Sequence, residues 1–292
     1  MNPPRSIIVT GANRGIGKAI CKAILERNRT LQLKEARPLK LFATSRVGFE
    51  LSRSLALGQD VQIVYPKLDV SDHDSIRALV DEVKRNHGAN VDILINNAGV
   101  NLDLDPKHGY GYENARRTLN VNYRGTKWMC QNFIPLMRPH AGRIVNLSSV
   151  ASSLKIYSET VQRRFRDTRA SLEDLDRLAE DYLTSVKDHR EVESGFGHPG
   201  RSYNISKALV NSLTAILARD HPDLLINCCC PGWVGTDMGA FVGRGRSRPP
   251  KSPDEGAKIP VRLALDDIDG VSGKYWANST VRSKLEGSVQ NW

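Results

Sequence analysis

A tyrosine and a lysine four residues apart, Tyr203 and Lys207, form the pair in this 292-residue sequence best suited to proton transfer. Residues four apart share one face of a helix, and residues 202–219 have the apolar pattern of a helix. A phenol has a reference pKa of about 10, which is too high for efficient acid–base catalysis at neutral pH. An ammonium about 4 to 5 Å away would lower that pKa by roughly two to three units. The pair therefore predicts a general acid, Tyr203, tuned by Lys207.

A glycine-rich turn at residues 10–17 is the second feature with chemical meaning. It follows an apolar, β-branched run and opens an amphipathic helix expected over Gly15 to Glu26. Glycines there permit a tight turn and let a pyrophosphate approach the helix N-terminus, although a turn without a ligand is the alternative. The residues expected to contact a dinucleotide are Gly11, Asn13, Arg14, Gly15, Ile16 and Gly17.

Short apolar strands that alternate with amphipathic helices must position these groups. Strands are expected at residues 6–10, 39–44, 61–64, 91–95, 143–147 and 224–230, and further helices at about 72–83, 115–133 and 202–219. Ser71 or Asp72 is the N-cap of the 72–83 helix, and Ser252 forms a capping box with Glu255 for a last one. This alternation predicts an α/β fold, a doubly wound parallel sheet covered on both faces, as one domain over residues 1–292.

Residues 150–201 interrupt that alternation, because they separate a strand from the next helix by far more than a usual connection. Ser171 can cap a helix inside this segment. The apolar residues that follow it fall on one face, namely Leu172, Leu175, Leu178, Tyr182, Leu183 and Val186. We therefore predict a helical insertion at about 150–201, placed before Tyr203.

Composition narrows the class of protein. Hydrophobic residues make up 40% and charged residues 25%, which is typical of a globular chain. We expect a cytoplasmic protein with no membrane partner, since no apolar stretch is long enough to span a bilayer and no signal-peptide pattern is present. The five cysteines, at positions 21, 130 and 228–230, include no C-x-x-C pair, so we expect small buried hydrophobic residues and no metal site.

A net charge of +10 leaves an acidic partner such as nucleic acid open. Basic residues are densest at 163–166 and 244–248, but neither cluster lies in a nucleic-acid-binding motif. We interpret both as solvated surface and expect no nucleic-acid partner.

Five motifs occur in the order and approximate spacing of the short-chain dehydrogenases/reductases, and the resemblance covers essentially the whole chain. They are the G-x-x-x-G-x-G loop at 11–17, the segment Asn96-Asn97-Ala98-Gly99, Asn122, Ser149, and the Y-x-x-x-K pair Tyr203 and Lys207. The resemblance implies a Rossmann-type sheet and transfer of hydride between a nicotinamide cofactor and a carbonyl or alcohol group.

The same resemblance implies the role of each residue. Tyr203 would protonate the carbonyl oxygen, Ser149 would hydrogen-bond that oxygen, and Lys207 would also hold the ribose hydroxyls. Ser149 is chosen over Ser148 because the family's serine is the second of such a pair. Asn122 would support a proton-relay water. In the loop after the 224–230 strand, Pro231, Gly232, Val234 and Thr236 would contact the nicotinamide, and Trp233 and Met238 would line the substrate site.

The cofactor predicted is NADPH/NADP+. An acid at the end of the second strand holds the 2′-hydroxyl of NAD, whereas this strand ends in Thr44-Ser45-Arg46, and an arginine suits a 2′-phosphate. Arg14 in the glycine loop favours the same cofactor. Asp69 and Val70 resemble the family's adenine contact, although a helix-capping role for Asp69 is the alternative. The turn after the fourth strand adds Asn97, Ala98 and Gly99.

The insertion before Tyr203 resembles that of the monomeric carbonyl reductases, in which extra helices cover the dimer surface. We therefore expect a monomer that reduces small-molecule ketones, aldehydes or quinones. Two alternatives stay open: a reductase or alcohol dehydrogenase of narrow substrate range, and a binding or regulatory protein that keeps the cofactor without turnover.

Overall fold

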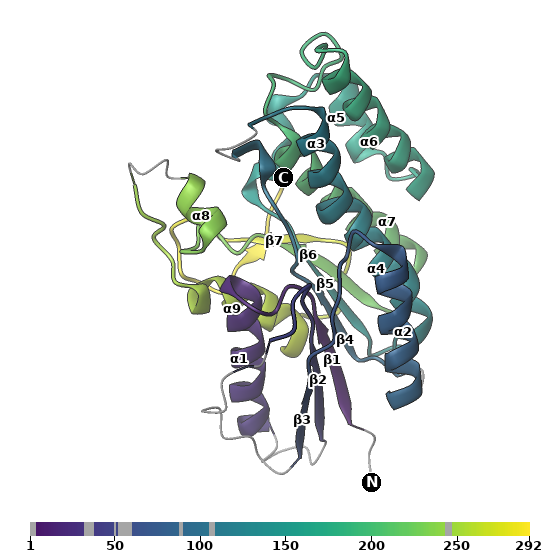
Figure 1. The fold of residues 1–292 in the computed structure, drawn as a ribbon, viewed down its shortest axis with the longest axis vertical. Helices are drawn as coiled ribbons and strands as arrows, with labels where there is room; N and C mark the ends of the chain where they lie inside the picture. Colours follow the sequence, from purple (N-terminus) through teal and green to yellow (C-terminus); the bar gives the residue numbers. More distant parts are fainter. Residues whose placement is uncertain are drawn as a thin grey trace.

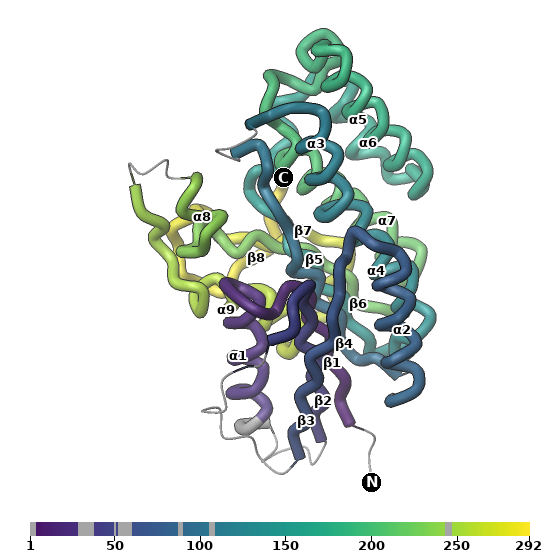
Figure 2. Tube along the Cα trace, in the orientation of Figure 1, coloured from purple at the N-terminus to yellow at the C-terminus, as the bar shows by residue number. Residues whose placement is uncertain are grey.

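A computed structural model of the chain describes residues 4–31, 38–49, 51, 60–87, 90–104, 109–242 and 247–292. Within this part, eight strands form one sheet in the order β3-β2-β1-β4-β5-β6-β7-β8 (Figures 1 and 2). All neighbouring strands are parallel except β7 and β8, which pair antiparallel. The strands are β1 (Arg5–Val9), β2 (Leu39–Ala43), β3 (Val61–Val64), β4 (Ile93–Asn96), β5 (Arg143–Leu147), β6 (Leu225–Cys229), β7 (Tyr275–Ala277) and β8 (Ser288–Val289).

Helices cover both faces of the sheet. They are α1 (Gly15–Leu31), α2 (His73–His87), α3 (Tyr112–Leu119), α4 (Gly125–Phe133), α5 (Glu159–Arg166), α6 (Leu172–Lys187), α7 (Ser202–Asp220), α8 (Asp237–Val242) and α9 (Pro253–Leu265). Figure 1 shows α1 and α9 on one face and α2, α4 and α7 on the other. Ile7 and Val9 pack in the α1 layer and Ile8 in the α7 layer, because successive side chains of a strand point to opposite faces.

The predicted doubly wound parallel sheet is confirmed, with strands close to their expected bounds. β7 and β8 were not predicted, because runs of three and two residues are too short to show a period. The helix expected over 115–133 is wrong in one respect. α3 and α4 are joined by a π-helical turn, Asn120–Arg124, and such turns frequently occur at functional sites.

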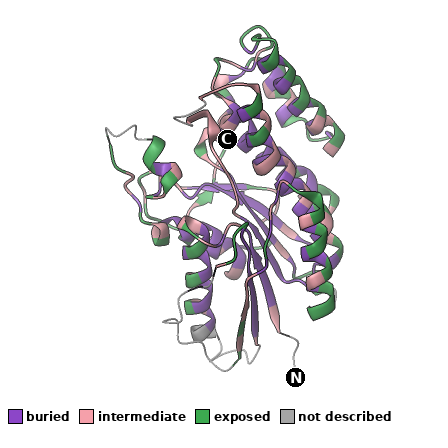
Figure 3. Ribbon diagram, viewed as in Figure 1, coloured by how far each residue is buried: buried purple, intermediate pink, exposed green. Residues whose placement is uncertain are grey.

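The predicted insertion is helical and consists mainly of α5 and α6. Ser171 caps α6 as expected: its hydroxyl accepts from the N–H of Asp174 at 3.2 Å, and the Asp174 carboxylate accepts from the N–H of Ser171 at 2.8 Å. The apolar face of α6 is buried on α3 and α7, while its outer face is exposed (Figure 3). The insertion therefore shares a hydrophobic core with the sheet.

Candidate functional site

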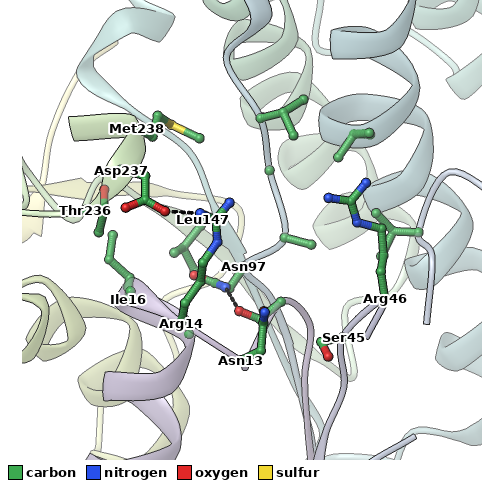
Figure 4. A pocket seen from close by; sticks show the side chains of 18 of the residues that line it. Asn13, Arg14, Ile16, Ser45, Arg46, Asn97, Leu147, Thr236, Asp237 and Met238 are labelled. Atoms are coloured by element: carbon green, nitrogen blue, oxygen red, sulfur yellow. Dashed lines mark hydrogen bonds and ion pairs between the residues drawn. The ribbon is translucent and has the colours of Figure 1, made fainter. Parts of the chain in front are cut away.

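A cavity of about 430 Å³ lies at the carboxyl ends of the parallel strands, where the strand order reverses between β1 and β4. Ligands of open α/β sheets bind at such a switch point. Most of the predicted site residues line it, namely Gly11, Asn13, Arg14, Gly15, Ile16, Gly17, Arg46, Asp69, Val70, Asn97, Ala98, Gly99, Tyr203, Lys207, Pro231, Thr236 and Met238 (Figure 4). Within the described chain, the predicted residues outside this lining are Asn122, Ser149, Gly232, Trp233 and Val234.

The glycine loop is held by close backbone contacts. A Cβ at Gly17 would lie 2.2 Å from the carbonyl oxygen of Gly11, and Gly11 itself has a φ of +66°. The Asn97 side-chain amide donates to the carbonyls of Thr10 at 2.8 Å and Gly11 at 3.1 Å. These contacts fix the loop against the end of β4, so glycine is required at position 17 for steric reasons.

The two arginines expected to hold a 2′-phosphate point apart in the structure. Arg46 follows β2 with an exposed side chain, whereas the guanidinium of Arg14 donates to the carboxylate of Asp237 at the start of α8 (Figure 4). Both members of that ion pair are exposed, so water screens it. Of the two arginines, Arg14 is therefore paired with Asp237 and Arg46 is not.

Asp69 lines the cavity, but its carboxylate is engaged locally. It accepts from the N–H and the hydroxyl of Ser71 at 2.9 and 2.6 Å. The N-cap of α2 is Asp72, whose carboxylate accepts from the N–H of Asp74 at 2.9 Å. The Asp69 side chain thus orders the turn before α2, which agrees with the alternative interpretation of this residue.

Tyr203 and Lys207 lie in the first turns of α7 and both line the cavity. The Lys207 ammonium donates to the carbonyl of Leu147 at 2.7 Å and lies 5.7 Å from the centre of the Tyr203 ring. The side chain of Ser149, which follows β5, interacts with that of Tyr203 and lowers the pKa of its phenol. Three residues from two elements therefore meet at one end of the cavity.

The expected lowering of the Tyr203 pKa by Lys207 is wrong for this structure. Burial raises the pKa of the Tyr203 phenol to about 12, and the hydrogen bond with Ser149 offsets only part of that rise. Burial also lowers the pKa of the Lys207 amine to about 8. A phenol and an ammonium that both lose solvent each shift toward the neutral form, and at this separation their attraction does not compensate.

Asn122 lies in the π-helical turn and is completely buried. Its amide forms a two-way bond with Val100, accepting from the N–H and donating to the carbonyl, each at 2.8 Å. The same amide donates to the Ser206 hydroxyl at 2.9 Å. A Cβ at Gly99 would lie 3.2 Å from Asn122 Oδ1 and 3.6 Å from Lys207 Nζ, so the fold brings Asn122 and Lys207 to the same place.

The loop after β6 departs partly from expectation. Val234 is buried, and its backbone forms an isolated β-bridge with that of Lys251. The Trp233 indole donates to the carbonyl of Gly239 at 2.8 Å. Met238 lines the cavity, which supports its predicted role in lining the substrate site. Trp233 is not among the residues that line the cavity, so its predicted role lacks that support. Lys251, which the sequence analysis did not single out, is 2% exposed and donates to the carbonyl of Pro231 at 2.7 Å.

Asp103 is a second residue that the sequence analysis missed. Its carboxylate accepts from the N–H of Tyr203 at 2.9 Å and from the hydroxyl of Ser202. The local sequence held no signal for this role, because Ser202 is itself a preferred N-cap residue. Only the structure places Arg201 at the N-cap position and leaves the first N–H groups of α7 to a partner from elsewhere in the chain.

The remaining expectations concern cysteines, metals and membranes. All five cysteines are buried and free, as predicted. Across the described residues, no group of three or more His, Cys, Asp and Glu side chains is placed to hold a metal ion. Nor does any described helix have the length and apolar composition of a membrane span.

Comparison with known proteins defines the class. A family model described as short chain dehydrogenase matches residues 5–161. Carbonyl reductase (NADPH) 1 of Bos taurus is 34% identical over 289 residues, covering 94% of this chain and 96% of that protein. The (+)-neomenthol dehydrogenase of Arabidopsis thaliana is 34% identical over 285 residues, covering 90% and 92%. The structure of salutaridine reductase from Papaver somniferum has a TM-score of 0.77 and 30% identity, covering 93% of this chain and 99% of that one.

The chain belongs to the short-chain dehydrogenase/reductase family. It is an oxidoreductase that acts on carbonyl or alcohol groups, and it resembles the carbonyl reductases over nearly its full length. The family resemblance expected from the five sequence motifs is therefore confirmed.

Proposed function

We propose that this protein reduces ketones, aldehydes or quinones with NADPH, using Tyr203 as the general acid. One observation carries the proposal: Tyr203, Ser149 and Lys207 meet at one end of a cavity whose other end is the glycine loop. A hydroxyl, a phenol and an ammonium at that point suit proton transfer to an oxygen atom.

The residues present fit a dinucleotide. The glycine loop at the N-terminus of α1 offers backbone N–H groups to a pyrophosphate, and the close backbone packing of Gly11 and Gly17 keeps side chains out of that approach. Arg46 would hold the 2′-phosphate, and Thr236 and Pro231 lie where a nicotinamide would be contacted. The bound reduced nicotinamide would supply the hydride.

Tyr203 must carry its proton in the reductive direction, and the raised pKa of about 12 keeps the phenol protonated at neutral pH. Hydride addition to a carbonyl carbon leaves an alkoxide, which is more basic than a phenolate. The proton of Tyr203 Oη therefore passes to the substrate oxygen, toward which Ser149 directs a second hydrogen bond. Desolvation, which makes the phenol a weak acid in the free protein, thus does not oppose this direction of reaction.

Lys207 and Asn122 would return the proton. Lys207 Nζ uses one of its three donors on the carbonyl of Leu147, which leaves two for ribose hydroxyls beside Tyr203. Asn122 holds Val100 and Ser206 in place around Lys207, and its position next to Gly99 suits a relay from Lys207 to solvent.

We also infer that the chain is one domain and a monomer. A single cluster of buried side chains joins Ile8 and Ile144 of the sheet to Leu178 and Tyr182 of the insertion, which supports one folding unit. α6 covers α3 and α7, a surface that would otherwise be free to pair with a second copy. Sedimentation equilibrium should give a mass near 32.4 kDa, and a multiple of that mass would overturn this inference.

The direct test is NADPH consumption against a mixed panel of carbonyl compounds, repeated with NADH and with Tyr203→Phe. Turnover with NADPH that the variant loses supports the reaction, the acid and the cofactor together. Tight NADPH binding without turnover on any member of the panel would favour the narrow-range or binding alternatives. A protein that neither binds NADPH nor consumes it would overturn the proposal.

A further inference from the structure

A chain of buried and half-buried polar side chains joins the insertion to the first turn of α7. We call it the insertion network, and its members are Asp103, Tyr110, Tyr182, Glu191 and Ser202. Tyr182 and Ser202 are completely buried and Glu191 is 3% exposed. Buried polar groups cost free energy unless each is paired, so such a chain has a defined geometry.

At the α7 end, Asp103 replaces the missing N-cap. The first N–H groups of a helix have no partner within the helix, and Arg201, which precedes α7, supplies no side-chain cap among the described contacts. Asp103 Oδ2 accepts from the N–H of Tyr203 at 2.9 Å, and Oδ1 accepts from the Ser202 hydroxyl. A carboxylate here also lies at the positive end of the helix dipole. The backbone of Tyr203 is thus anchored by a residue one hundred positions earlier in the chain.

At the other end, the network is rooted in the insertion. The Tyr182 side chain of α6 interacts with that of Ser202, and this interaction lowers the pKa of the Tyr182 phenol against the effect of burial. Its hydroxyl lies 3.4 Å from the hydroxyl of Tyr110, which donates to the Glu191 carboxylate at 2.7 Å. Tyr182 and Glu191 come from the insertion, and Asp103 and Tyr110 come from the segment between β4 and α3. The insertion therefore contacts α7 through specific polar groups as well as through its apolar face.

We propose that Asp103 is a positioning residue for Tyr203, and that the insertion holds the two together through Tyr182 and Ser202. The proposal rests on the proposed function, since it assigns a cause to the placement of the general acid. Proton transfer requires the phenol within hydrogen-bond reach of the substrate oxygen, so a small displacement of the first turn of α7 lowers turnover. NADPH affinity should change little, because the glycine loop and Arg46 lie outside the network.

The charge of Asp103 adds a pH dependence. The groups that face its carboxyl are Ser202 and Tyr203 with their hydrogen bonds, the cation of Arg201, and the phenols of Tyr157 and Tyr182. Burial raises the pKa of Asp103 above the ordinary value of 3.8, while Arg201 and the hydrogen bonds counter part of that rise. Burial also raises the pKa of both phenols, which keeps them neutral across the working range. Acidification therefore protonates Asp103 and weakens the cap.

The decisive variants are Asp103→Ala, which removes the acceptor, and Asp103→Asn, which keeps an acceptor without the charge. Turnover per NADPH-binding site should fall about tenfold or more in D103A, with NADPH affinity changed by less than about twofold. D103N should keep roughly a third or more of the turnover at neutral pH and should lose the acidic decline in kcat that Asp103 causes in the wild type. Amide exchange at Tyr203 should be faster in D103A than in the wild type.

Asp174→Ala is the matched control, because the Asp174 carboxylate completes the capping box of α6 with the same kind of hydrogen bonds, accepting from the N–H and the hydroxyl of Ser171. It should lower the melting temperature without changing turnover per NADPH-binding site. Equal losses of turnover in D174A and D103A would overturn the proposal, as would a D103A protein with wild-type turnover and wild-type exchange at Tyr203.

If D103A does not fold, D103N and Tyr182→Phe carry the test. Tyr182→Phe should lower kcat by about threefold with unchanged NADPH affinity. The proposal is rejected if Tyr182→Phe leaves kcat unchanged and D103N also leaves the pH profile of kcat unchanged. The two proposals fail in different ways. If the proposed function is wrong, the wild-type protein shows no turnover. If only the positioning role is wrong, the wild type turns over, Tyr203→Phe abolishes that turnover and D103A does not.

Discussion

The two walls of the cavity are built by different means. The glycine wall, residues 10–17 and 97–99, depends on side chains that are absent: a Cβ at Gly17 would lie 2.2 Å from the carbonyl oxygen of Gly11, so only glycine fits there. The helix wall, which consists of Tyr203 and Lys207 with the neighbouring Ser149 and Asn122, depends on side chains that are present. Asn122 and Lys207 are buried, and each is held by a partner from another segment of the chain. A wall of the first kind can be identified from a short motif, whereas a wall of the second kind exists only once the chain has folded.

The largest effect is expected on the helix wall. Tyr203→Phe removes the proton donor and keeps the ring, so kcat should fall roughly 10²- to 10⁴-fold while NADPH still binds. Steady-state kinetics combined with fluorescence titration of NADPH measure both quantities. A fall of less than about tenfold would mean that another group supplies the proton.

The next effect concerns the buried ammonium on the same wall. Lys207 has a pKa lowered to about 8 in the folded protein, against an ordinary value of 10.5. Between those two pH values the unfolded state binds more protons than the folded state, so the contribution of Lys207 to stability rises with pH, by up to about 3 kcal/mol. Urea unfolding of wild type and Lys207→Met between pH 7.5 and 10.5 should show this rise in the wild type alone. If the free energy of unfolding depends on pH in the same way in both proteins, the Lys207 ammonium is exposed to solvent and not buried.

The glycine wall should respond to a single methyl group. Gly17→Ala places a Cβ against the carbonyl of Gly11, and since that neighbour is backbone, we expect a loss of about 2 kcal/mol in stability and weaker NADPH binding. Gly111→Ala is the control, because a Cβ there meets nothing within 4 Å and the backbone is extended. Thermal unfolding and NADPH titration test both variants. If G17A behaves like G111A, steric exclusion does not define this wall.

The smallest effect concerns the edge of the glycine wall. Arg46→Ala should reduce the preference for NADPH over NADH by about tenfold, because a charge-assisted hydrogen bond to an exposed phosphate contributes on the order of 1 to 2 kcal/mol. Arg14→Ala serves as the comparison, since Arg14 pairs with Asp237 and points away from Arg46. The measurement is the ratio of kcat/KM with NADPH to kcat/KM with NADH in each variant. If R14A lowers this ratio more than R46A does, Arg14 and not Arg46 contacts the 2′-phosphate.

Several parts of the molecule were predictable because they depend on local sequence. The glycine loop, the alternation of strands and helices, the Ser171 N-cap and the Ser252 capping box all rest on residues within a few positions of one another. The insertion was predictable for the same reason, since the apolar face of α6 follows a helical period. The π-helical turn at Asn122 was not, because no local pattern separates it from an ordinary helix.

The sequence by itself determined the family, the order of the elements and the residue types that carry the chemistry. Only the tertiary structure decided how those residues are held and what pKa values they have. Lys207 proved too deeply buried to lower the pKa of Tyr203, and Asp103 proved to be the cap of α7. The physical reason is that desolvation and hydrogen-bond partners depend on segments that are 60 to 100 residues apart in the chain and adjacent only in the folded protein.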